Sequence, residues 1–262
     1  MKIDFHTHGK LAKDLYFSEE YTYNMFNQAL NSGLDAICLT EHFNTTQFDD
    51  VYKYVRDISK RDGDTLVLEN GLRIFPGIEV DISEGGHILC IGEVDEILEL
   101  RNELKPHIDN FLKFSDLMNI FDKYHVLVGA ADPFRPGKSA NIPTIDHEEL
   151  KRLSFIDLNG KDLALYGEEM EKKVRDFANS LNLPLIGGSD THQENQYGAV
   201  YNVFDREYNS IDEIYEAVLE NRYEIQIHDN IVNKVETASL IKKLLKEINI
   251  LGGDYAQVVL EG

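Results

Sequence analysis

The chain has 262 residues, of which 42% are hydrophobic and 28% charged, and its formal net charge is −21 at pH 7. This composition is typical of a soluble globular protein, and no apolar run approaches the roughly 20 residues that cross a bilayer, so we expect no membrane partner. Because an acidic surface repels the phosphate backbone of DNA and RNA, we also expect no long nucleic acid as a partner.

Short apolar strands alternate with amphipathic helices along the chain. In chain order the pattern predicts a strand at 2–6, a helix at 19–31, a strand at 35–39, a helix at 49–61, strands at 73–80 and 87–91, a helix at 108–123, a strand at 126–131, a helix at 146–153, a strand at 155–158, a helix at 168–181, strands at 185–188 and 201–204, and helices at 211–220 and 238–248. Ser18 and Asp146 are predicted N-caps, since each stands just before a pair of glutamates.

The repeated strand–helix alternation predicts an α/β fold with a mainly parallel sheet and helices outside it. We find no linker-like segment and no internal repeat, so we expect one domain over residues 1–262, which the strand and helices after residue 200 complete. A closed or nearly closed barrel would gather the carboxyl ends of its strands at one mouth.

Cys38 and Cys90 each lie in an apolar, strand-like run, which is typical of buried free thiols in a reducing compartment; a disulfide is the less favoured alternative. Residues 1–4 enter a strand at once, which leaves no room for a secretory signal. We therefore expect a cytoplasmic location.

The first predicted strand carries Asp4, His6 and His8 at alternate positions. Their side chains share one face of the strand, so the two imidazoles can bind one metal ion and Asp4 can orient an imidazole. On their own, two histidines at a strand end are as readily explained as ordinary structural residues.

Further candidate ligands follow later strands. His42 comes after the second strand, Glu79 ends the third, and His87 opens the next strand eight residues later. A carboxylate among histidines can bridge two metal ions, as two-metal hydrolases require. Asp190 and His192 follow Gly187 and Gly188 on one tight loop, where glycine allows a close approach of the backbone to the site.

In order along residues 3 to 200, these segments resemble the motifs of the polymerase and histidinol phosphatase (PHP) family of metal-dependent phosphoesterases. The resemblance rests on Asp4-Phe5-His6-Thr7-His8, Thr40-Glu41-His42, Gly77-Ile78-Glu79, Ala130-Ala131-Asp132-Pro133 and Ser189-Asp190-Thr191-His192. It implies a distorted seven-stranded (β/α) TIM-like barrel with two or three divalent ions, zinc, manganese or iron, at the carboxyl ends of the strands.

The resemblance also implies a set of ligands for each ion. The first ion would take His6, His8, Glu79 and Asp190, the second Glu79, His87 and Asp132, and the third Asp14, His42 and His192. Asp132 stands where the family has a histidine. A carboxylate still binds such ions and favours the harder ones, although Asp132 can also be read as a residue that only starts a turn before Pro133.

The resulting prediction is a metal-dependent hydrolase of phosphate esters that acts on a small phosphorylated substrate such as a nucleotide, a sugar phosphate or histidinol phosphate. A metal-activated water would attack phosphorus, and Asp190 or His192 would relay a proton to the leaving group. Arg135 and Lys138 are the candidates for binding the phosphate, and Arg135 is preferred because its planar fork matches phosphate oxygens.

Two other functions stay open at this point. One is an amidohydrolase-type metal hydrolase, which also opens with two alternate histidines on a first barrel strand. The other is a metal-binding domain without turnover, which the aspartate at position 132 keeps possible. The substrate, the metals and the oligomeric state lie beyond the sequence.

Overall fold

In the computed structural model, which describes residues 1–137 and 141–261, eleven strands form one sheet. They are β1 (Lys2–Thr7), β2 (Ala36–His42), β3 (Ser59–Asp62), β4 (Thr65–Leu68), β5 (Arg73–Asp81), β6 (His87–Gly92), β7 (Val126–Ala131), β8 (Phe155–Asn159), β9 (Leu185–Gly188), β10 (Val200–Phe204) and β11 (Tyr223–Ile227). The main path through the sheet runs β11-β10-β1-β2-β5-β6-β7-β8-β9, and β3 and β4 branch from β5.

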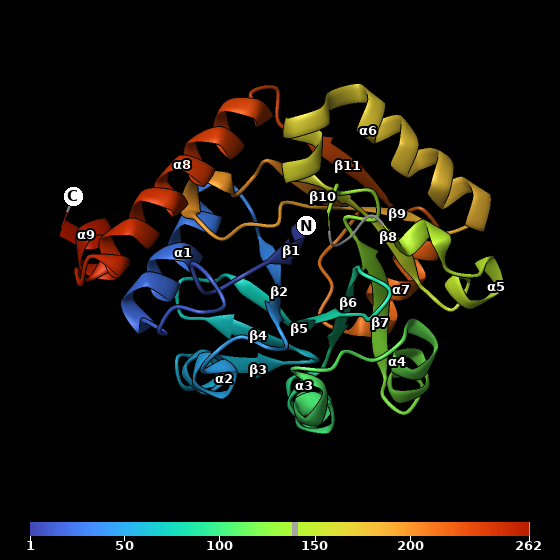
Figure 1. Ribbon diagram of the computed structural model, residues 1–262, viewed down its shortest axis with the longest axis horizontal. Helices are drawn as coiled ribbons and strands as arrows, with labels where there is room; N and C mark the ends of the chain where they lie inside the picture. The colour runs from blue at the N-terminus through green and yellow to red at the C-terminus, as the bar shows by residue number, and fades with distance from the viewer. Residues whose placement is uncertain (138–140, 262) are drawn as a thin grey trace.

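Seven strands of this path, from β1 to β9, curve round until their two ends meet (Figure 1). A parallel bridge joins Thr7 to Thr191, the amide of His8 donates to the carbonyl of Thr191 at 2.9 Å, and the amide of Asp190 donates to the carbonyl of His6 at 2.8 Å. The sheet is thus a nearly closed barrel, which confirms the predicted fold class. We call this meeting of β1 with the end of β9 the seam.

The prediction of a mainly parallel sheet is wrong. The pairs β1–β2, β2–β5, β7–β8 and β8–β9 are parallel, whereas β3–β4, β4–β5, β5–β6, β6–β7, β1–β10 and β10–β11 are antiparallel. Only residues 82–86 separate β5 from β6, and a parallel neighbour would need a crossover of a dozen residues or more. Because β6 runs against its neighbours, its first residue, His87, lies beside Asp81 and Ala131 at the carboxyl ends of β5 and β7.

Nine α-helices within the described ranges surround the barrel (Figure 1). They are α1 (Glu19–Asn31), α2 (Phe48–Asp57), α3 (Val94–Leu104), α4 (Phe114–Phe121), α5 (His147–Leu150), α6 (Gly160–Leu181), α7 (Ile211–Leu219), α8 (Ile231–Ile250) and α9 (Tyr255–Glu261). A large core cluster packs the helices against the sheet, and a smaller one joins alternate strand residues such as Ile3 and Phe5 to α7.

Several predicted boundaries match the structure, and both predicted caps are confirmed. The helix Glu19–Asn31 and the strands Val126–Ala131 and Leu185–Gly188 have the expected ends. Ser18 accepts a hydrogen bond from the amide of Tyr21, and Asp146 accepts one from the amide of Glu148. A side-chain acceptor before the first turn satisfies an amide that has no partner within the helix.

Other boundaries differ. The helix predicted over 49–61 ends at Asp57, because Asp62-Gly63, with φ of +61° at the glycine, turns the chain into the β3–β4 hairpin. The helix predicted over 108–123 covers only Phe114–Phe121, and the one predicted over 168–181 begins earlier, at Gly160, with a break at Gly167. The sequence pattern did not predict α3, α9, β4 or β11.

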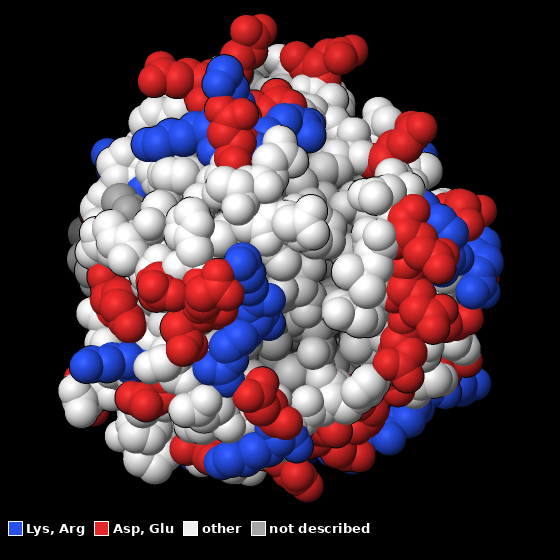
Figure 2. Space-filling model, turned by 90° about the vertical axis from the view of Figure 1, so that its right-hand side faces the viewer, with Lys and Arg blue, Asp and Glu red and all other residues white. Residues whose placement is uncertain are grey.

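The surface carries both signs of charge. Figure 2 shows one face on which acidic side chains are interspersed with lysine and arginine around an uncharged area. Cys38 and Cys90 are buried and free, as expected. Among the described helices, none has the length and apolarity that a membrane crossing requires.

Candidate metal centre

Three groups of histidine and carboxylate side chains meet at one mouth of the barrel. Their members come from the carboxyl ends of β1, β2 and β5, from the start of β6, and from the loops after β7 and β9. Within each group the ligand atoms lie within 4.8 Å of one another. The groups are His6, His8 and Asp190; Glu79, His87 and Asp132; and His8, His42 and His192.

Glu79 lies at the centre of these groups. Its Oε1 is 3.6 Å from His6 Nε2 and 3.3 Å from His87 Nδ1. Its Oε2 is 3.5 Å from His8 Nε2 and 2.8 Å from His42 Nδ1. Four imidazoles therefore surround one carboxylate, which is the arrangement that a carboxylate bridging two cations requires.

The first group joins the two sides of the seam. Asp190 Oδ1 lies 3.5 Å from His8 Nε2 and 3.8 Å from His6 Nε2. On the far side of the His6 ring, Nδ1 lies 3.0 Å from Asp157 Oδ2, so Asp157 sets the ring orientation and leaves Nε2 facing Glu79 and Asp190.

Asp4, predicted to orient an imidazole, has a different role. Its Oδ1 accepts hydrogen bonds from the backbone amides of His6 at 3.2 Å and Ser189 at 2.9 Å, so it fixes the backbone at the seam. Asp157, which the sequence analysis did not single out, orients the imidazole instead. The sequence does contain a signal for Asp157. It is a carboxylate within the apolar run of β8, and a buried acid requires a partner.

The second group holds both the predicted Asp132 and a further carboxylate. His87 Nδ1 lies 3.3 Å from Asp132 Oδ1, and His87 Nε2 lies 3.3 Å from Asp81 Oδ1. Asp132 and Asp190 both have left-handed backbones, with φ of +38° and +58°. Aspartate tolerates this conformation better than most residues do, and both of these aspartates lie just after the end of a strand.

The third group is made of imidazoles. The ring centroids of His8 and His192 are 4.0 Å apart, and those of His8 and His42 are 4.5 Å apart. Asp14, predicted beside His42 and His192, is not a member of this group. Its side chain is 66% exposed and lies 3.6 Å from the ammonium of Lys246, because the loop after β1 carries it outward.

The donor atoms fit divalent cations. Several buried ligand atoms have no hydrogen-bond partner of good geometry in the described structure, and each such atom costs on the order of 1–3 kcal/mol unless something binds it. All are imidazole nitrogens or carboxylate oxygens, the donors that zinc, manganese and iron take. They are His6 Nε2, both ring nitrogens of His8, His42 Nδ1, Glu79 Oε2 and Asp132 Oδ2.

The electrostatics keep Glu79, Asp190 and His192 in their metal-binding forms. Burial opposes ionisation of Glu79 and of Asp190, but the neighbouring imidazoles hold the pKa of Glu79 well below its usual value, and Arg135 with His8 does so for the pKa of Asp190. Burial and the nearby His8 hold the pKa of His192 well below its usual value. Ionised carboxylates and a neutral imidazole are the states that ligate cations. Nearby carboxylates, by contrast, raise the pKa values of three other imidazoles above the usual value despite burial, so a cation would displace their protons; these are His6, His8 and His87.

Arg135 lies inside the site. Its guanidinium contacts three carboxylates: Nη1 is 2.6 Å from Asp132, Nε is 2.7 Å from Asp162, and Nη2 is 3.0 Å from Asp190. The predicted phosphate-binding arginine thus bridges the candidate ligands Asp132 and Asp190. Asp162 went unnoticed in the sequence, where it reads as an ordinary first-turn acid of α6. Lys138, the other predicted phosphate-binding residue, lies outside the described residues.

Two further polar residues near the mouth, Asn159 at the end of β8 and Lys10 in the loop after β1, have structural roles. Asn159 caps α6, since its side-chain oxygen accepts from the amides of Lys161 and Asp162, and its amide donates to Asp157 at 3.2 Å. Lys10 is buried, and its ammonium donates to the carbonyl and the hydroxyl of Thr46.

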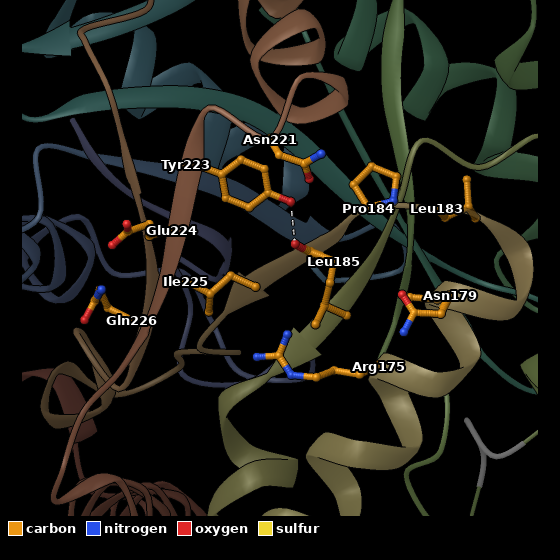
Figure 3. A pocket seen from close by; sticks show the side chains of 11 residues that line it. Arg175, Asn179, Leu183, Pro184, Leu185, Asn221, Tyr223, Glu224, Ile225 and Gln226 are labelled. Atoms are coloured by element: carbon orange, nitrogen blue, oxygen red, sulfur yellow. Dashed lines mark hydrogen bonds between the residues drawn. The ribbon is translucent and has the colours of Figure 1, made fainter.

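A separate cavity lies at the other end of the barrel strands, away from the mouth where the three groups meet. It has a volume of about 540 Å³ and is lined by α6, the start of β9 and β11, where the hydroxyl of Tyr223 donates to the carbonyl of Leu185 at 2.7 Å (Figure 3). Arg175 at its side is paired with Glu171. This cavity contains none of the clustered histidines and aspartates.

Comparisons with known proteins identify the fold. Residues 170–223 match the family model described as PHP-associated. The crystal structure of PsfC from Pseudomonas syringae has a TM-score of 0.73 at 20% identity, over 93% of this chain and 98% of that one. An amidohydrolase from Chromobacterium violaceum has a TM-score of 0.55 at 13% identity, over 85% of this chain and 97% of that one. No curated protein matches the sequence.

A further similar structure corrects one expectation. The lesion-specific endonuclease PfuEndoQ from Pyrococcus furiosus has a TM-score of 0.64 at 18% identity, over 86% of this chain, which spans 58% of that one. Endonuclease Q has also been solved with a 27-mer duplex that carries an abasic lesion at the active site. This fold accommodates duplex DNA in that protein, so the prediction that a long nucleic acid is excluded was wrong. Net charge was the wrong quantity, because it averages over the whole surface.

Proposed function

We propose that this chain, whose fold is that of the PHP family, is a metal-dependent hydrolase of phosphate esters. The observation that carries the proposal is the position of Glu79 among four imidazoles, with unpartnered buried donor atoms around it. Such a donor set is suited to divalent cations. Eight of the nine predicted ligands, all but Asp14, belong to the three groups.

The site would use divalent cations as Lewis acids that activate water and neutralise charge on the phosphate. The residues of the chain prepare the site for this chemistry. Asp157 fixes the ring of His6, and Glu41 Oε1, 3.7 Å from His8 Nδ1, faces the ring of His8. We propose Asp190 or His192 as the group that relays a proton to the leaving alkoxide, since both lie at the mouth beside the other candidate ligands.

Arg135 remains our candidate for the phosphate oxygens. Its planar N–H fork suits them, and once Asp132 and Asp190 bind cations, the N–H groups that these carboxylates now occupy become available. Within the phosphate esters we propose a small phosphomonoester, such as a nucleotide, a sugar phosphate or histidinol phosphate, as the substrate.

The decisive test is hydrolysis by protein of measured metal content. The wild type, loaded with manganese, zinc or iron, is expected to release phosphate from an aryl phosphate or a member of a metabolite panel. Glu79→Gln should lower the rate by on the order of 1,000-fold or more, because the central charge among the imidazoles is lost. Glu207→Gln, the same change on an exposed loop, is the matched control and should not alter the rate.

The same preparations separate the competing functions. A 27-mer duplex with an abasic site belongs in the panel, since endonuclease Q acts on such DNA. The similarity to an amidohydrolase makes amides and lactones the second candidate substrates, and turnover of these without any phosphate release would replace our proposal. Inactivity of fully loaded protein on every substrate would favour a metal-binding domain without turnover.

A further inference from the structure

A cavity of about 430 Å³ opens beside the metal centre, on the side of α8, and we call it the α8 cavity. This volume lies within the range of small-molecule pockets, roughly 300–1,000 Å³. Its wall joins two of the three imidazoles of the third group to basic side chains from the loop after β1 and from α8. The residues concerned are Lys13, Asp14, His42, His192, Lys242 and Lys246.

Helix α8 presents two lysines to this cavity. Lys242 and Lys246 are four residues apart, so they lie on one face of the helix, and both are half-buried. Lys243, the next residue along, is exposed and does not line the cavity. The helix thus directs its basic face at His42 and His192.

The α8 cavity is positive although the chain is strongly acidic. Three lysines against one aspartate give it a formal charge of +2, whereas the whole chain carries −21. A positive cavity next to a hydrolytic centre raises the local concentration of anions and steers them inward.

Lys242 lines this cavity with no ion-pair or hydrogen-bond partner for its ammonium among the described residues. Lys246, in contrast, lies 3.6 Å from Asp14. Burial lowers the pKa of Lys242 to about 8, so the ammonium is still mostly charged at neutral pH. Asp190 and Glu41 only partly offset this effect of burial, so an anion bound in the cavity would stabilise the ammonium further.

We propose that the α8 cavity binds a second anionic group of the substrate, a phosphate that is not hydrolysed, through Lys242 with Lys246 and Lys13. The metal centre and Arg135 would bind the phosphate that reacts, so these lysines are left to bind a different anionic group. The inference deepens the proposed function and, as far as turnover is concerned, rests on it. It assigns the substrate to compounds with two phosphates rather than one.

Anion binding tests the α8 cavity without any turnover. Inorganic sulfate, titrated calorimetrically into chelator-treated protein, is expected to bind the wild type and to bind Lys242→Met at least about tenfold more weakly, as for the loss of one charged hydrogen bond. Lys243→Met, its neighbour on the outer face, should bind like the wild type. Lys242→Arg keeps the charge and should retain most of the affinity. Equal affinity of the wild type and folded Lys242→Met would overturn the proposal.

Selectivity tests the same idea during catalysis. The ratio of kcat/KM for propane-1,3-diol bisphosphate to that for its monophosphate should exceed about ten in the wild type, fall toward one in Lys242→Met and stay unchanged in Lys243→Met. If both compounds are hydrolysed with a ratio that Lys242→Met does not alter, the second-anion site is wrong and the phosphoesterase stands. If sulfate binding depends on Lys242 but neither ester is hydrolysed, the site stands and the phosphoesterase is wrong.

Discussion

At the scale of single residues, the centre is organised by carboxylates that hold imidazoles. Glu79 faces four of them, and Asp157 fixes the ring of His6 from behind through a 3.0 Å contact to Nδ1. Burial raises the pKa of Asp157, and its contact with His6 opposes that rise. Asp157 is therefore a positioning residue, because it acts on the site only through the ring it orients.

Replacing Asp157 by asparagine is expected to weaken metal binding by about 10- to 100-fold, because the His6 ring loses the carboxylate that sets its tautomer and increases its basicity. Competition with a chromophoric chelator measures the affinity. Thermal unfolding in excess chelator is the control, since asparagine keeps the shape of the side chain. A variant that holds metal as tightly as the wild type would show that Asp157 only packs.

Residues of the site differed in how well the sequence revealed them. Most candidate ligands could be found because each follows or ends a strand in a short motif. These are His6, His8, His42, Glu79, Asp190 and His192. Asp81, Asp157 and Asp162 could not, because whether a strand or first-turn acid points into a mouth depends on the curvature of the sheet. Asp14 lies outside the three groups and pairs with Lys246, and the loop after β1 has no periodicity that shows which way its side chain points.

At the scale of elements, the seam between β1 and β9 decides whether the site exists. His6 and His8 come from one side of it and Asp190 and His192 from the other. Gly188 makes the approach possible. A Cβ at this residue would lie 2.5 Å from the Cβ of His6 and 2.8 Å from Asp157 Oδ1, which is closer than real atoms pack.

Gly188→Ala should therefore push β9 away from β1, destabilise the fold by about 1–3 kcal/mol and lower the metal content of the purified protein. Urea unfolding and metal analysis check the two effects. Gly9→Ala is the matched control, since a Cβ there would meet its nearest atom, a methyl of Thr22, at an ordinary 3.4 Å. Equal loss of metal in both variants would contradict the role given to the seam.

The elements themselves were predictable to an uneven degree. The barrel strands and α1 followed from hydrophobic pattern, but the short link between β5 and β6 makes a hairpin that a strand–helix reading hides. The β3–β4 hairpin was signalled by Asp62-Gly63, and β11 by the alternation of Tyr223, Ile225 and Ile227. The long helical pattern around residues 49–61 concealed the β3–β4 hairpin, because periodicity alone does not show where a helix ends.

At the scale of the whole molecule, charge is unevenly distributed. A net charge of −21 led to a wrong exclusion of nucleic acid, while lysines line the α8 cavity beside the metal centre. The total charge describes solubility and repulsion between molecules, whereas substrate choice depends on the few groups at the mouth. The fold agrees with structures at about 20% identity, so the substrate must be inferred from this chain's own residues.

Metal should also stabilise the molecule as a whole, because the candidate ligands come from β1, β2, β5, β6 and the loops after β7 and β9. A cation at about 100 times its Kd should raise the Tm by about 5–10 °C, and chelator should reverse the rise. Differential scanning fluorimetry with manganese or zinc measures the shift. Glu79→Gln is expected to respond much less, and an equal shift in that variant would place the stabilising ion elsewhere.

The seam also has a consequence for the order of events during synthesis. The hydrogen bond from Ser189 to Asp4 spans 185 residues, and the first pair of histidines is translated long before Asp190 and His192, which lie beside them in the folded chain. A nascent chain on the ribosome therefore offers only an open, weak chelate until most of the barrel has emerged. If the groups bind cations as we propose, capture of the ions is a late step that coincides with barrel closure, and a prematurely terminated chain would lack them.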